Sequence, residues 1–126
     1  CFVLTMPPVV HVFFGAEALR FGIHAGDIDI SMMLHLAPGT VHMEHAQNFR
    51  STSQDRAERF AILGNGKSAK MGWAMEDYHP SGAVGQADAA TADKGRAVVQ
   101  AAGAALAALL AEVAALPLDT VRVAGV

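Results

Sequence analysis

The chain has 126 residues, enough for one domain or part of one, and a chain of this length can bury a core without disulfides or metals. Its formal net charge of −3 argues against a nucleic-acid-binding protein, which needs a basic face to neutralise phosphates. Hydrophobic residues make up 52% of the chain and charged residues 17%, so we expect apolar surface that packs against a partner subunit or more of the same polypeptide.

The first elements are predicted to be extended. Residues 1–6 are apolar and rich in β-branched and aromatic side chains, and they end at two prolines, a pattern that predicts a short buried strand. Residues 9–14 are expected to form a second extended segment, ended by Gly15. This apolar start has no basic leader, so it is not typical of a signal peptide.

The sequence begins at Cys1 rather than at a methionine, and we expect it to begin inside a longer polypeptide. Cys1 is the single cysteine and cannot form an internal disulfide, which favours a cytoplasmic location. An N-terminal cysteine can be a nucleophile activated by its own amine, but a strand residue is the simpler interpretation.

A histidine, a tight turn and two acids lead into the first long helix. After the turn at Gly26 we predict a helix over residues 28–36, stopped by Pro38 and Gly39. Its apolar residues cover most of its circumference, so it is expected to be buried nearly all round; they are Ile28, Met32, Met33, Leu34 and Leu36.

The middle of the chain is the most irregular part. Residues 47–59 are polar and predict a surface loop with one helical turn near residues 54–59. A turn is predicted at residues 64–66, a strand at residues 71–75 and a loop through residues 78–82.

The last large element is predicted to be a long amphipathic helix. Thr91 is a good N-cap, Asp93 suits the first turn, and Pro117 follows the end. Apolar residues recur at steps of three and four; they are Val98, Ala102, Leu106, Leu109, Val113 and Leu116. Glu112 and the many alanines favour a packing helix over a membrane span. Strands followed by helices, with no linker between them, predict a single α/β unit over residues 1–126.

His24, Asp27 and Asp29 form the clearest group of chemically active side chains. A hydrolytic divalent metal takes imidazole and carboxylate ligands and keeps an open position for water. The structural alternative is that Asp27 caps the helix, Asp29 complements its dipole and His24 is a satisfied core histidine. Spacing alone favours this structural alternative.

Three further groups have both a functional and a structural interpretation. His42 and His45, with Glu44 between them, could bind zinc, but a solvated loop after the helix is the favoured interpretation. Trp73 could line a substrate pocket, although a core or interface tryptophan is commoner. A third cluster could form the rim of a pocket or simply lie on the surface; it consists of Asp77, Tyr78 and His79.

Several motifs resemble the creatininase (creatinine amidohydrolase) family in collinear order. His24-Ala25-Gly26 and the acid at 29 resemble its H-A-G-x-x-E-T-S signature, and residues 31–38 resemble the S-x-M-L-x-L-x-P continuation. Residues 80–85, Ala90-Thr91 and Lys94-Gly95 are similar to its closing P-x-G-x-x-G, A-T and K-G segments. The resemblance covers roughly residues 20–116.

The resemblance implies a metal-dependent hydrolase that cuts a C–N bond of a small cyclic or linear amide. The metal would be zinc, manganese or iron. His24 takes the position of the proton-shuttling histidine, and Asp29 that of a glutamate at the metal site. Members of the family are homo-oligomers and act on small molecules, with no nucleic-acid or membrane partner.

The departures from the family pattern limit what this chain can do alone. Asp29 is one methylene shorter than the family's glutamate, and Ile30 replaces its threonine. The N-terminal E-x-H and G-H-G-G-N metal-ligand motifs are absent. We therefore expect residues 1–126 to be the C-terminal half of a partial creatininase-type α/β unit that supplies only part of an active site. A non-catalytic folding or oligomerisation module is the alternative.

Overall fold

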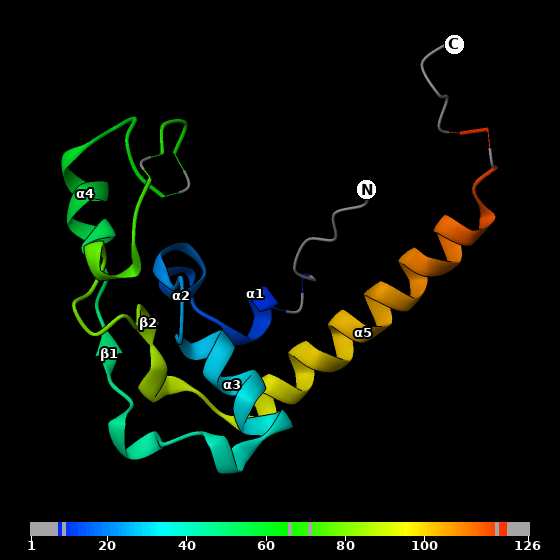
Figure 1. Ribbon diagram of the computed structural model, residues 1–126, viewed down its shortest axis with the longest axis horizontal. Coiled ribbons are helices and arrows are strands. Elements are labelled where there is room, and N and C mark those ends of the chain that lie inside the picture. The colour runs from blue at the N-terminus through cyan, green and yellow to red at the C-terminus, as the bar shows by residue number, and fades with distance from the viewer. Residues whose placement is uncertain (1–7, 9, 66, 71, 118, 121–126) are drawn as a thin grey trace.

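The computed structural model describes residues 8, 10–65, 67–70, 72–117 and 119–120 (Figure 1). The α-helices are α1 (Val10–Phe13), α2 (Ala16–Phe21), α3 (Asp27–Leu36), α4 (Ser53–Arg59) and α5 (Ala92–Ala115). Short 3₁₀ turns η1 to η4 cover Pro38–Thr40, Met43–His45, Met75–Asp77 and Ala87–Ala89. In the described residues, strands β1 (Asn48–Phe49) and β2 (Gly85–Gln86) form an antiparallel pair. The predicted α/β class is confirmed in a helix-rich form.

Helix α3 confirms the helix predicted over residues 28–36 and begins one residue earlier, at Asp27. Its first turn carries two acids, which suit the positive end of the helix dipole. The prediction that it is buried nearly all round is wrong, because Met33 and Leu36 are 40% and 61% exposed. The buried residues of the helix are polar, Asp27 and Ser31, and they face the start of α5.

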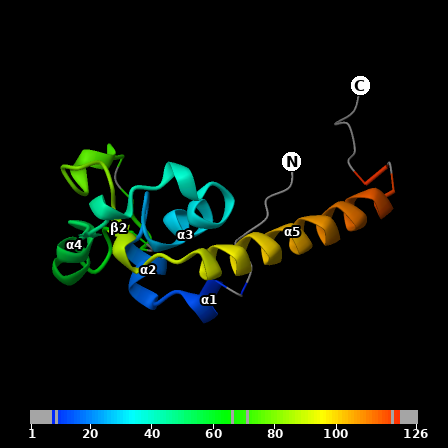
Figure 2. The ribbon, with the colours of Figure 1, turned by 90° about the horizontal axis from the view of Figure 1, so that it is seen from below.

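Helix α5 confirms the predicted C-terminal helix and its cap. The Thr91 hydroxyl accepts a hydrogen bond from the Lys94 backbone N–H at 3.3 Å, and the helix ends before Pro117. Its buried residues are Gly95 and Val98, both near its beginning. Figures 1 and 2 show the rest of α5 extending away from the other helices.

The crossing of α3 and α5 depends on a glycine. A Cβ atom at position 95 would lie 1.8 Å from the backbone oxygen of Ser31. Only a residue without a side chain lets the two backbones approach this closely. Beside the crossing, Val10 and Phe14 pack with Val98 to form the core cluster of the described residues.

Two predicted extended segments are wrong where the structure describes them. Residues 10–13 form the helical turn α1, which places Val10 and the following Phe14 four residues apart, and both reach the core. Residues 72–74 form no strand, because the Asp77 carboxylate accepts a hydrogen bond from the Ala74 N–H at 2.8 Å and favours the turn η3. The strand predicted over residues 1–6 lies outside the described residues.

Candidate active-site turn

The turn that precedes α3 is attached to a second loop by backbone hydrogen bonds. The N–H groups of Ile23 and His24 donate to the Val84 carbonyl at 3.0 and 3.3 Å, and the Val84 N–H donates to the His24 carbonyl at 2.7 Å. Val84 is completely buried, whereas the side chain of His24 is exposed. The main chain of His24 is therefore fixed while its imidazole remains accessible, so the structure does not make it a core histidine.

Close backbone packing and one unusual residue shape this turn. A Cβ atom at Gly85 would lie 2.9 Å from the Cα atom of Gly26 and 3.3 Å from that of Gly22. Ala25 has a φ angle of +54°, in the left-handed region that costs a non-glycine residue about 1 kcal/mol or more. Such strain persists where the surroundings hold the backbone, and it is concentrated at functional sites.

Asp27 has a more specific role than the predicted cap. The N-cap position belongs to Gly26, and Asp27 is the first helical residue, 5% exposed. Its carboxylate forms an ion pair with the Lys94 ammonium at 2.7 Å and accepts a hydrogen bond from the Ser31 hydroxyl at 3.0 Å.

This polar network links the turn to the start of α5. The Ser31 hydroxyl accepts a hydrogen bond from the Thr91 N–H at 3.0 Å, and the Lys94 ammonium also donates to the Ala89 carbonyl at 2.8 Å. Sequence reasoning missed this network, although Ser31 and Lys94 both lie within the motifs singled out. The signal that could have found it was an acid at the start of one motif and the lysine of the other.

The structure places Asp29 at the edge of a cavity. Its carboxylate accepts a hydrogen bond from the Gly26 N–H at 3.4 Å, and its side chain is exposed. The cavity has a volume of about 280 Å³, and its lining includes Ile23, Gly26, Asp27, Asp29 and Gln86. In the described residues, no three His, Cys, Asp or Glu side chains gather into a group that could hold a metal. The roles of His24 and Asp29 therefore stay predictions.

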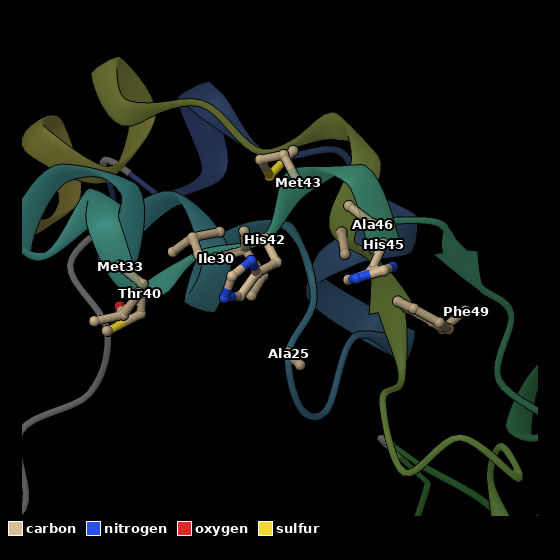
Figure 3. A pocket seen from close by; sticks show the side chains of 11 residues that line it. Ala25, Ile30, Met33, Thr40, His42, Met43, His45, Ala46 and Phe49 are labelled. Atoms are coloured by element: carbon tan, nitrogen blue, oxygen red, sulfur yellow. The ribbon is translucent and has the colours of Figure 1, made fainter.

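A second cavity, of about 230 Å³, lies between α3 and the turn η2 (Figure 3). Its lining is mostly apolar, including Ile30, Met33 and Phe49, and the rings of His42 and His45 also reach it. The two ring centroids are 6.3 Å apart. Hydrogen bonds from its own backbone and from His42 lower the pKa of Glu44, whose carboxylate lies 3.1 Å from the His42 ring. In the described residues, the structure therefore adds no third zinc ligand to His42 and His45.

The remaining candidate residues make packing contacts and local hydrogen bonds and do not line the two cavities. Trp73 is 47% exposed and packs edge to face on Tyr78, with ring centroids 5.0 Å apart. Tyr78 is 1% exposed and its hydroxyl donates to Asn65 at 3.0 Å, so it is a core residue. His79 lies in a loop, 2.7 Å from the Ser81 hydroxyl. Cys1 lies outside the described residues.

Comparisons with known proteins show what the chain is similar to. The profile of the Creatininase family, described as creatinine amidohydrolase, matches residues 6–110. A crystal structure from Bacteroides fragilis NCTC 9343, of a protein provisionally named a creatinine amidohydrolase, is similar with a TM-score of 0.65 and 27% identity. The match covers 86% of this chain and 40% of that one, so the chain spans less than half the length of this relative. A search of the curated proteins finds no match.

Proposed function

Because the chain belongs to the creatininase family, we propose that it supplies part of the active site of a metal-dependent amidohydrolase acting on a small cyclic or linear amide. The observation that carries this proposal is the family match across residues 6–110, which contains the His24 turn with its fixed backbone and exposed imidazole. The proposal also includes a cytoplasmic location, a homo-oligomeric assembly and a position as the C-terminal half of a longer creatininase-like unit.

His24 would carry a proton in this reaction. Imidazole is the side chain most often used as a general acid or base, and it must be held within hydrogen-bonding reach of the reacting group. The two hydrogen bonds between the main chains of His24 and Val84 provide such a fixed position. The left-handed Ala25 and the close-packed Gly26 hold the following backbone.

The metal would be zinc, manganese or iron, with Asp29 as one ligand. The described residues do not fit a complete metal site, because they contain no group of three suitable side chains. Any further ligands must come from outside these residues. Within the described residues, Asp29 contributes a carboxylate at the edge of the cavity.

Replacing His24 with asparagine tests the proton-carrying role. In the intact enzyme that contains this chain, turnover of creatinine, a lactam or a formamide should fall by about 10²- to 10⁴-fold, the usual contribution of a general acid or base. Metal content by elemental analysis should not change, because His24 is not proposed as a ligand. His35→Asn, on the last turn of α3, is the matched control and should retain activity. Full activity in the His24 variant would remove the proposed role.

Replacing Asp29 with glutamate tests whether the site is a weakened form of the family's. The added methylene restores the reach of the family's glutamate, so the chain should retain more zinc, manganese or iron after dialysis. Asp93→Glu, on the exposed first turn of α5, controls for the added methylene elsewhere. Unchanged metal retention would mean that Asp29 serves only the helix terminus.

A non-catalytic folding or oligomerisation module is the second candidate. The observation that favours it is that the Asp29 carboxylate already accepts the Gly26 N–H and gathers no other metal-binding side chains in the described residues. Elemental analysis of the purified 126-residue chain separates the two candidates. Stoichiometric zinc, manganese or iron contradicts the inert module, and a chain without metal confines catalysis to a longer parent protein.

A further inference from the structure

The outer part of α5 carries apolar side chains that the described part of the chain leaves uncovered. Leu106 and Leu110 are 48% and 59% exposed. With Leu109 and Val113 they follow steps of three and four residues, which place them on one side of the helix. We call these four residues the outer stripe. Figures 1 and 2 show that this part of the helix projects from the body in both views.

The outer stripe continues a face that is buried at its other end. Val98 is completely buried against α1, and Ala102 follows it one turn later on the same side. Burial of apolar side chains stabilises a fold, so the exposed Leu106 and Leu110 and the half-buried Leu109 and Val113 leave apolar surface that a partner could cover. The face has the composition of a protein core but is packed at one end only.

The related structure is much longer than this chain. The chain matches 40% of the Bacteroides fragilis protein, so most of that protein has no counterpart here. The family match reaches residue 110, so Leu106, Leu109 and Leu110 lie inside the shared domain and not in an appended anchor. We propose that the outer stripe packs against the part of the creatininase fold that this chain does not match. This proposal depends on family membership and not on the proposed activity.

Two other partners fit the face less well. By length and hydropathy α5 could cross a membrane, with 6% of the apolar window buried. However, Glu112 interrupts the apolar stretch, and a carboxylate inside a membrane-spanning helix is costly. Two copies joined by the four residues of the outer stripe alone would bury less than the roughly 1,200–2,000 Å² of a typical specific interface, whereas a partner that completes the same fold is not limited to this stripe.

The test combines the 126-residue chain with a separate polypeptide that contains the unmatched part of the Bacteroides fragilis protein. Light scattering after gel filtration should show a one-to-one complex. The double variant Leu106→Glu/Leu110→Glu should weaken binding by about 100-fold or more, because two carboxylates would be buried in an apolar contact. Ala108→Glu, exposed on the opposite side of α5, is the matched control and should bind normally.

The other partners correspond to distinct results. A homodimer that the double variant dissociates would overturn the proposal in favour of a second copy. Binding to phosphatidylcholine–phosphatidylglycerol vesicles, lost in the double variant, would overturn it in favour of lipid. If the separate polypeptide does not fold alone, the same substitutions at the aligned positions of the intact Bacteroides fragilis protein should lower its Tm by about 10 °C or more. An unchanged Tm there would also overturn the proposal.

Failure of this proposal and failure of the proposed function are distinguishable. Binding and Tm are measured without turnover, so a chain that forms the complex but hydrolyses no amide would keep the interface and remove the activity. An active chain that binds normally with glutamate in the outer stripe would keep the proposed activity and remove the proposed interface.

Discussion

Replacing Gly95 with alanine is expected to destabilise the fold by about 3 kcal/mol or more, the upper part of the range for overpacked sites. The reason is geometric. The added Cβ atom would lie 1.8 Å from the backbone oxygen of Ser31 and 2.8 Å from the Met32 nitrogen, so the helices must separate. Backbone atoms cannot rotate away as a side chain can. Urea denaturation followed by far-ultraviolet circular dichroism measures the change in the free energy of unfolding.

Gly103→Ala is the matched control in the same helix, with the opposite sign expected. A Cβ atom there meets no atom within 4 Å, and the position is exposed. Alanine is the better helix former, so the free energy of unfolding should rise by up to about 1 kcal/mol. If Gly95→Ala were as stable as the wild type, the described crossing of α3 and α5 would be wrong.

The second large effect is expected at the Asp27–Lys94 ion pair. Asp27→Ala should lower the free energy of unfolding by about 3 kcal/mol, because it leaves the ammonium without its carboxylate partner in a largely buried site. The Asp27 side chain is 6% exposed and that of Lys94 is 24% exposed, so Lys94 can recover part of the loss by turning toward water. Urea denaturation at constant salt concentration measures the loss.

A double-mutant cycle isolates the pair. Lys94→Met keeps most of the aliphatic stem, and combining it with Asp27→Ala should cost less than the two single changes together, by about 1–3 kcal/mol. Asp93→Ala is the control, because its pair with Arg96 is exposed and contributes at most about 1 kcal/mol. Additive single changes would mean that the two charges do not interact.

Local signals predicted the two long helices well. Pro38 and Gly39 mark the end of α3, because proline cannot continue a helix. Thr91 marks the beginning of α5, because its hydroxyl satisfies a free backbone N–H. Both helix boundaries were predicted from these residues. The short apolar segment at residues 10–13 is a different case. Its residues are compatible with a strand or a helical turn, and only contacts with Val98, distant in sequence, decide between them.

The candidate site was predictable only in part. The motif around His24 located the turn, but the residues that hold it could not be paired from local patterns. Asp27 and Lys94 are 67 residues apart, and Val84 holds His24 through main-chain atoms that carry no sequence signal. The burial predicted for α3 was wrong for a related reason. The inner side of α3 carries the polar Ser31, whose backbone lies against Gly95 and whose hydroxyl bonds Thr91, and apolar periodicity does not predict such a contact.

The hydrogen bond between Ser31 and Thr91 spans 60 residues, and this separation affects how the protein folds. Each helix can form locally within about a microsecond, but their docking must first close a long loop, whose entropic cost precedes any gain from contact. We therefore expect the rate of folding to be set by this encounter and not by helix formation. Until it occurs, the serine hydroxyl and the aspartate carboxylate of α3 remain solvated in the nascent chain.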